Sequence, residues 1–135
     1  MTQIYTDGSC WHGDRIGGWA WVTWPDQEWG GGSDVDTTIS RMELMGPIDG
    51  LETLYERYGA LSLDVFSDSE YVVKGMQYPS RARNLNNDLW DWLESVVSYH
   101  EKVRWFHVRG HTGVVENEMA DDIAGSFRKA RQKNE

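Results

Sequence analysis

The chain has 135 residues and a single cysteine, Cys10, which excludes an internal disulfide and a cysteine-rich zinc site. Hydrophobic residues make up 39% and aromatic residues 13%, enough for the core of one domain over residues 1–135. Thirteen basic residues against 22 acidic ones give a net charge of −9, so the overall field would repel phosphates. A nucleic-acid function would therefore need a local basic surface, or cations held by the carboxylates.

Targeting signals are missing from the sequence. The first residues have no basic and apolar leader pattern, and no apolar run reaches 18 residues. We therefore expect a cytoplasmic protein that contacts no membrane, and we expect a monomer.

The first part of the chain predicts three consecutive strands. Residues 3–6 and 19–24 are rich in β-forming side chains, and a double glycine precedes the second run. Pro25-Asp26 predicts a turn, after which the glycine-rich residues 27–33 can return as a third strand. These strands would form a meander.

Helices alternate with strands in the rest of the chain. Ser40-Arg41-Met42-Glu43 has the form of a capping box and begins a helix to Tyr58, in which Gly46 and Pro47 predict an irregular first turn. The following elements are a strand at 61–67, a short helix from Ser69 to Met76, a loop at 77–87, a helix at 89–99, a strand at 102–108 and a helix at 116–131. This order predicts an α/β fold, with a mixed five-stranded sheet flanked by helices.

Acidic residues occur where strands are expected to end or helices to begin. Asp7 ends the first strand, Glu43 lies in the first turn of the long helix, and Asp68 ends the fourth strand. Asp121 or Asp122 would add a fourth carboxylate, because both lie at similar angles from the apolar face of the last helix. Such positions gather at one edge of an α/β sheet, where carboxylates repel one another unless a hard cation such as Mg²⁺ neutralises them.

Each carboxylate also has a purely structural explanation. Asp7 with Gly8 is a turn signal, Glu43 could complete the capping box, and Asp68 could cap the short helix. Independent turns and caps need not converge at one edge of a sheet, so their joint placement favours a site.

Five short motifs follow one another between about Ile4 and Phe127, nearly the whole chain. The motifs are Thr6-Asp7-Gly8-Ser9-Cys10, Arg41-Met42-Glu43-Leu44-Met45, Ser67-Asp68-Ser69-Glu70-Tyr71-Val72, Gly110-His111-Thr112-Gly113 and Glu116-Asn117-Glu118-Met119-Ala120-Asp121. In this order and at this spacing they resemble the successive motifs of the type 1 ribonuclease H family. Each motif is weak alone, but five in register are specific.

The resemblance implies an endonuclease with the ribonuclease H-like fold that hydrolyses the RNA strand of an RNA–DNA hybrid. Asp7, Glu43, Asp68 and Asp121 match the family's catalytic carboxylates, which hold two Mg²⁺ ions that Mn²⁺ would replace. The resemblance thus selects Asp121 where periodicity does not. His111 matches a loop histidine implicated in proton transfer or product release. In-line hydrolysis with two metals would leave 5′-phosphate and 3′-hydroxyl ends.

Several residues are candidates for holding the hybrid. Gly8 and Ser9 match family positions that approach the RNA strand near the cut, where the 2′-hydroxyl distinguishes RNA from DNA. Thr38, Arg41 and Asn86 are weaker candidates for phosphate contacts, since hydroxyl, guanidinium and amide groups suit them.

The chain departs from many members of the family in a segment that contacts the substrate. Many members carry a basic helix and loop, the handle, where this chain has only the interval 77–87. We expect Arg81 and Arg83 in this interval to grip the hybrid instead. The alternative is the basic segment 127–133, whose cations could equally be solvated groups placed favourably at a helix C-terminus.

Two other functions stay open on the sequence. A transposase, integrase or junction resolvase of the same structural superfamily would use similar carboxylates on DNA, although the motifs fit ribonuclease H better. A binding module without catalysis would gain nothing from clustered negative charge that faces phosphates.

Overall fold

The computed structural model describes the chain from Thr2 to Arg109 and from Val114 to Glu135, with the backbone alone described at 81 and 82. His111 and its motif therefore lie outside the described residues. Within the described part, every helix is too short or too polar to cross a membrane.

Five strands form one mixed sheet in the order β3-β2-β1-β4-β5. The strands β1, β2 and β3 are antiparallel neighbours, whereas β4 runs parallel to both β1 and β5. The predicted fold class is confirmed. The bounds are β1 Thr2–Cys10, β2 Gly17–Trp24, β3 Trp29–Asp34, β4 Ser62–Ser67 and β5 Lys102–His107.

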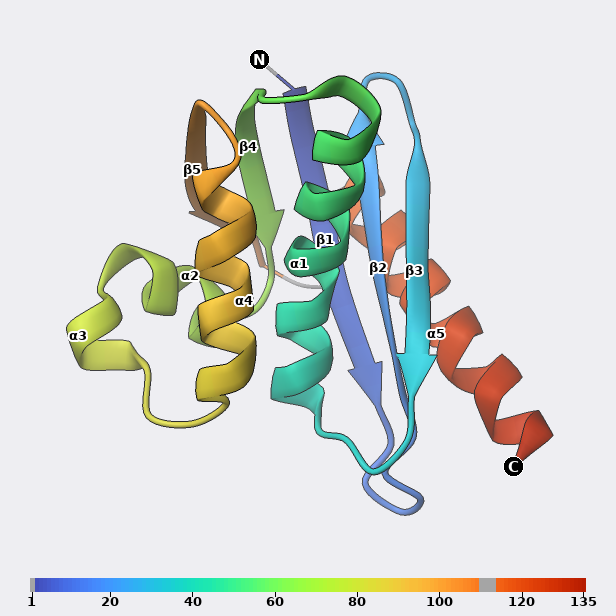
Figure 1. Ribbon diagram of the computed structural model, residues 1–135. Helices are drawn as coiled ribbons and strands as arrows, with labels where there is room; N and C mark the ends of the chain where they lie inside the picture. The colour runs from blue at the N-terminus through green and yellow to red at the C-terminus, as the bar shows by residue number, and fades with distance from the viewer. Residues whose placement is uncertain (1, 110–113) are drawn as a thin grey trace.

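Helices cover both faces of this sheet. Figure 1 shows α1 and α4 on one face and the long α5 on the other. The apolar alternation of β1 serves both layers, because Ile4 packs in the core cluster under α1 while Tyr5 packs in the cluster that includes Ala120 of α5. The bounds are α1 Ile39–Tyr58, α2 Glu70–Gln77, α3 Pro79–Ala82, α4 Asn87–Ser98 and α5 Val115–Asn134.

The first strand is longer than predicted. The sequence indicates a turn at Asp7-Gly8, yet β1 continues through both residues to Cys10. Asp7 is opposite Ala20 in the antiparallel pair with β2, so its backbone belongs to the sheet. The turn prediction is wrong because pairing on both sides of β1 outweighs the local preference of the dipeptide.

The start of α1 also differs from the prediction. Its N-cap is Thr38, whose Oγ1 accepts a hydrogen bond from the Arg41 backbone N–H at 3.3 Å, so Ser40 and Glu43 form no capping box. The helix then runs unbroken through Gly46 and Pro47, both buried against the sheet. A Cβ at position 46 would lie 3.1 Å from the Ala20 carbonyl oxygen, which explains glycine there.

The interval 77–87 is not entirely a loop. It contains α3, a four-residue helix that begins with Pro79. Proline suits a first helical position because its missing N–H would have no partner there.

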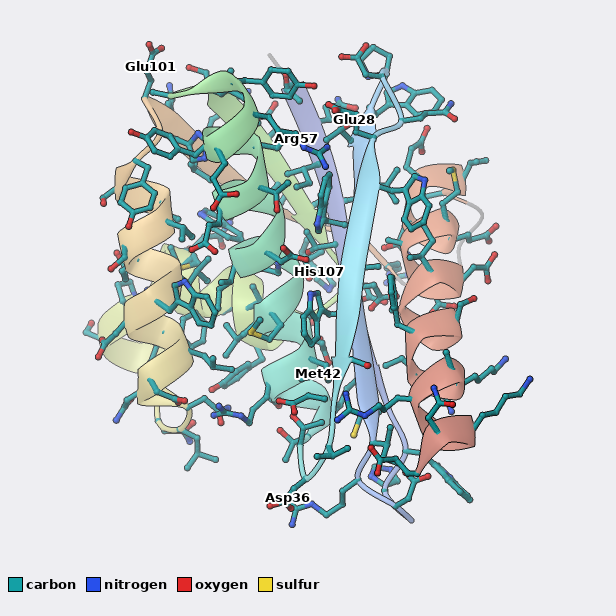
Figure 2. The ribbon with its side chains drawn as sticks, turned by 45° about the vertical axis from the view of Figure 1, so that its right-hand side comes forward. Glu28, Asp36, Met42, Arg57, Glu101 and His107 are labelled. Carbon is teal, nitrogen blue, oxygen red and sulfur yellow. The ribbon has the colours of Figure 1, made fainter. Side chains whose placement is uncertain are left out.

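The ends of the sheet differ in chemistry. Figure 2 shows Glu28 and Arg57 at the end opposite Asp36, and Arg57 Nη1 lies 3.2 Å from Glu28 Oε1. Met42 of α1 lies nearer the end with Asp36 (Figure 2). It packs against Gly17 at the start of β2, where an added Cβ would lie 2.5 Å from Met42 Cγ. This second end carries the carboxylates.

Candidate active site

Asp7 is a buried carboxylate on β1, the central strand of the sheet. The residue is only 4% exposed. Oδ1 accepts a hydrogen bond from the Gly8 N–H at 2.8 Å, whereas buried Oδ2 has no hydrogen-bond partner among the described residues. A buried carboxylate oxygen without a donor is costly, so this position needs a partner that the described residues do not supply.

Asp68 lies beside Asp7 because of the sheet register. Thr6 is opposite Ser67 in the parallel pair of β1 and β4, which places the next residues, Asp7 and Asp68, at adjoining strand positions. Asp68 does not cap α2. The cap is Ser69, whose Oγ accepts a hydrogen bond from the Val72 N–H at 3.3 Å. The Asp68 side chain is therefore left for another role.

Glu43 approaches from α1. Burial raises the pKa of the Glu43 carboxyl, a hydrogen bond from the Ser69 side chain lowers it, and nearby Asp68 raises it. Ser69 therefore serves α2 as its cap and also contacts Glu43. The sequence predicted Ser69 only as the start of a helix, because the Glu43 contact depends on tertiary structure.

Gly8 permits the close contact between β1 and α1. A Cβ at this position would lie 2.5 Å from the Glu43 backbone nitrogen and 2.6 Å from the Met42 carbonyl carbon. Real Cβ atoms do not tolerate such distances to backbone. Glycine thus allows the strand that carries Asp7 to pass directly against the helix turn that carries Glu43.

Asp121 contributes the fourth carboxylate, from the opposite face of the sheet. It lies half-buried on α5 and its carboxyl raises the pKa of Asp7. Asp122 is exposed and has no such effect on Asp7. Periodicity left these two residues equivalent, whereas the structure puts only Asp121 in electrostatic contact with Asp7.

The electrostatics of the cluster favour a cation. Burial, followed by the charges of Asp68 and Asp121, raises the pKa of Asp7 to about 9, and the hydrogen bond from the Gly8 N–H opposes this rise. The four carboxylates come from β1, α1, the β4–α2 turn and α5, and oxygen ligands of this kind suit a hard divalent ion. Among the described residues, no group of three His, Cys, Asp or Glu side chains is already arranged to hold a metal ion.

Arg41 and Asn86, two residues predicted to contact the substrate, are hydrogen-bonded to each other. Arg41 donates to both oxygens of Asp88, at 3.0 and 2.8 Å, and to Asn86 Oδ1 at 3.3 Å. Asn86 has a left-handed backbone with φ 63° and donates from Nδ2 to the Tyr71 hydroxyl at 3.2 Å. Arg41 and Asn86 thus form one surface, but Asp88 already neutralises the guanidinium. Thr38, exposed nearby, uses its hydroxyl as the cap of α1.

Arg83, which the sequence predicts to hold the hybrid, makes contacts within the protein instead. Its Nε donates to the Gly75 carbonyl at 2.9 Å, its guanidinium lies 4.5 Å from the Trp90 ring centroid, and it pairs with Glu94. The side chain is only 16% exposed. These contacts join α2 to α4 and leave little of the cation for a substrate. The side chain of Arg81 lies outside what the structure describes.

Ser9 lies where β1 passes α5. Its Oγ accepts a hydrogen bond from Arg128 Nε at 2.8 Å, across 119 residues of sequence. Arg128 lies in the basic segment 127–133, which the sequence offered as the alternative grip, but no local pattern predicted its contact with Ser9.

The chain is similar to ribonucleases H in sequence and in fold. Residues 1–129 match the RNase H family model. The ribonuclease H of Bartonella quintana is 35% identical, covering 99% of this chain and 93% of the relative, and that of Methylobacillus flagellatus is 39% identical, covering 92% and 89%. The N-terminal RNase H domain of a Mycobacterium tuberculosis protein, solved as a maltose-binding protein fusion, shares the fold with a TM-score of 0.83 at 20% identity, covering 98% of this chain and 96% of that one. The chain therefore belongs to the ribonuclease H family, enzymes that cleave RNA in RNA–DNA hybrids and generally depend on a divalent metal.

Proposed function

We propose that this chain, as one domain over residues 1–135, hydrolyses the RNA strand of RNA–DNA hybrids endonucleolytically at the Asp7, Glu43, Asp68 and Asp121 cluster. The observation that carries the proposal is the Asp7 carboxylate, buried with one oxygen unpartnered among the described residues and within the influence of two further aspartates. A purely structural carboxylate would not be held this way, because burial and repulsion both oppose its charge.

The four carboxylates would hold two Mg²⁺ ions, or Mn²⁺ in their place. When bound, the ions would activate the attacking water and stabilise the leaving 3′-oxygen, which gives 5′-phosphate and 3′-hydroxyl products. Asp7 is the residue best placed to contact both ions, since Asp68 and Asp121 influence it together. Ser69 holds the Glu43 carboxylate by a hydrogen bond, which makes Ser69 a positioning residue.

The chain's own groups would orient the RNA strand. Gly8 leaves the backbone beside Asp7 free of side chain, and Ser9 offers a hydroxyl one residue further along the same strand. A hydroxyl there can bond to an RNA 2′-oxygen, a contact that DNA cannot make. His111, which precedes α5 in the sequence and lies outside the described residues, would assist proton transfer or product release.

The proposal takes the protein as a cytoplasmic monomer. The named relatives are bacterial ribonucleases H. Light scattering at the concentration used in the cleavage assays measures the oligomeric state directly, and a stable dimer would contradict the monomer.

The decisive experiment compares three labelled duplexes, an RNA–DNA hybrid, double-stranded RNA and double-stranded DNA, with Mg²⁺, with Mn²⁺ and with chelator. We expect cleavage of the RNA strand of the hybrid alone, and no cleavage in chelator. Asp7→Asn should lower the rate by more than tenfold, while the matched variant Asp122→Asn, which changes an exposed carboxylate next to Asp121, should stay near the wild-type rate. Cleavage of double-stranded DNA would favour a DNA nuclease of the same superfamily instead.

A further inference from the structure

Arg128 differs from the other arginines in its partners. In the described part of the chain most arginines pair with a carboxylate, whereas Arg128 donates to neutral oxygens, to Ser9 Oγ at 2.8 Å and to Gln132 Oε1 at 3.0 Å. No salt bridge between described residues involves Arg128 or its neighbour Lys129. The paired arginines are Arg15 with Asp36, Arg41 with Asp88, Arg57 with Glu28, Arg83 with Glu94, Arg104 with Asp64 and Arg131 with Glu135.

Two open grooves meet at Arg128. One, of about 310 Å³, is lined by Asp121 and Asp122 as well as by Ser9, Arg128 and Lys129. The other, of about 610 Å³, contains the same Ser9, Arg128 and Lys129 and extends to Trp11 in the β1–β2 connection. Figure 1 shows the C-terminal half of α5 at the same end of the molecule as this connection. A continuous depression therefore leads from the candidate catalytic carboxylate past two cations that have no acidic partner among the described residues.

The position of Arg128 is set by glycines in the sheet. A Cβ at Gly18 would lie 2.3 Å from the Ala124 carbonyl oxygen and 2.7 Å from the Arg128 backbone nitrogen. A Cβ at Gly31 would lie 2.8 Å from the Phe127 ring. Only glycine lets α5 lie this close to β2 and β3, so the backbone of Arg128 is held against β2.

We propose that Arg128, with Lys129 beside it, binds a backbone phosphate of the RNA strand next to the scissile bond. This inference rests on the proposed function, because the groove that contains Asp121 is the one that continues to Arg128. Two of the five guanidinium N–H groups are used by Ser9 and Gln132, and the Nη2 group has no partner among the described residues. A planar fork with free donors suits a phosphate better than a point charge does.

Arg128 also orients the hydroxyl of Ser9. Because Ser9 Oγ accepts from Arg128 Nε, its own proton is left to donate outward. The neighbouring carboxylate of the wider groove, Asp14, accepts a hydrogen bond from Gln132 Nε2 at 3.0 Å. Gln132 thus separates Asp14 from the guanidinium and leaves the cation available to an anion.

Hybrid binding tests the phosphate contact without relying on catalysis. The probe is a fluorescent RNA–DNA hybrid titrated with protein in the inactive Asp7→Asn background at several salt concentrations. Arg128→Ala should raise the Kd by about tenfold. It should also reduce the magnitude of the slope of log K against log salt by about 0.9, the contribution of one phosphate. The matched control is Arg131→Ala, which removes an arginine already paired with Glu135 at 2.7 Å and should change neither quantity. Equal effects of the two variants would overturn the proposal.

Two further variants separate phosphate binding from damage to α5. Arg128→Lys keeps the charge but loses the fork, so it should restore most of the salt slope and only part of the affinity. A damaged helix would not be rescued by lysine, and a lysine variant no better than alanine would argue against the contact. Ser9→Ala should weaken binding less in the Arg128→Ala background than alone, because the arginine no longer orients the hydroxyl. Strictly additive effects would contradict the coupling.

Steady-state kinetics distinguishes failure of this site from failure of the proposed function. In the otherwise unchanged enzyme with Mg²⁺, Arg128→Ala should raise KM while kcat stays within about twofold, as expected for loss of uniform binding. If the unchanged protein cleaves hybrids but Arg128→Ala matches Arg131→Ala, only the Arg128 site is wrong. If the unchanged protein cleaves no hybrid, the proposed function fails, whatever the binding data show.

Discussion

Replacing Asp7 by asparagine should remove activity and at the same time stabilise the metal-free protein. The Asp7 carboxylate is 4% exposed, one of its oxygens has no partner among the described residues, and Asp68 and Asp121 repel its charge. Asparagine keeps the shape of the side chain and removes the charge. A mutation that abolishes an enzyme usually leaves its stability unchanged or lowers it, so a gain is a distinctive outcome.

The magnitude follows from the proton that Asp7 retains in the fold. In an unfolded chain an aspartate titrates near about pH 3.9, whereas burial together with Asp68 and Asp121 raises the pKa of folded Asp7 to about 9. Between these values the unfolded chain has lost the proton and the folded chain holds it, so the free energy of unfolding falls as pH rises, by at most about 1.4 kcal/mol per pH unit. At pH 7 this gives an upper bound of about 4 kcal/mol, which relaxation of the surroundings reduces to roughly 2 kcal/mol.

Thermal unfolding in chelator at pH 5, 7 and 8.5 measures this effect. Asp7→Asn should unfold about 6 °C above wild type at pH 7. The difference should grow with pH, because only folded wild type must hold at Asp7 a proton that the unfolded chain has released. Added Mg²⁺ should raise the midpoint of wild type and barely change that of Asp7→Asn. The exposed Asp122→Asn variant should follow wild type throughout. A lower midpoint for Asp7→Asn at pH 8.5, or a difference that does not change with pH, would refute a desolvated, repelled Asp7.

Three further variants test separate parts of the site. Asp68→Asn should show a smaller Mg²⁺-induced rise in the thermal midpoint than wild type, and an equal rise would place the ion elsewhere. Gly8→Ala should lower the free energy of unfolding by about 2 kcal/mol, because its Cβ would meet the Glu43 backbone nitrogen at 2.5 Å; calorimetry checks this against Gly125→Ala, where a Cβ meets nothing within 4 Å. His111→Ala should cleave hybrids about 10²–10⁴-fold more slowly, and an unchanged rate in single-turnover assays would remove the histidine from the mechanism.

Local pattern was sufficient for most of the fold. Alternating β-formers bounded by glycine and proline predicted all five strands, and helical spacing predicted the four longer helices to within a few residues at each end. The errors arose where tertiary contacts outweigh local preference. Asp7-Gly8 favours a turn in isolation, yet pairing with both β2 and β4 holds β1 extended there. Pro47 disfavours a helix interior, yet burial of α1 against the sheet keeps the helix regular.

The sequence predicted the four candidate carboxylates, but it did not predict their surroundings. Periodicity could not separate Asp121 from Asp122, because the two differ only in which one lies near Asp7, a contact made across the whole chain. For the same reason, the sequence could not predict the contacts of Arg83 and Arg128. Both are basic residues in basic segments, and only the fold pairs the first with Glu94 and Trp90 and the second with Ser9.

The acidic charge of the protein bears directly on how its candidate site can attract an anionic hybrid. A chain of net charge −9 approaches a polyanion, and several of its arginines are already neutralised by neighbouring carboxylates. Attraction must then come from few places, because each ion pair within the protein weakens the field available to a phosphate. In the proposed site the four carboxylates would attract a phosphate only after cations bind, which would tie affinity for the hybrid to the same ions that the proposed catalysis needs. A neighbouring arginine without an acidic partner, such as Arg128, matters more in such a protein than it would in a basic one.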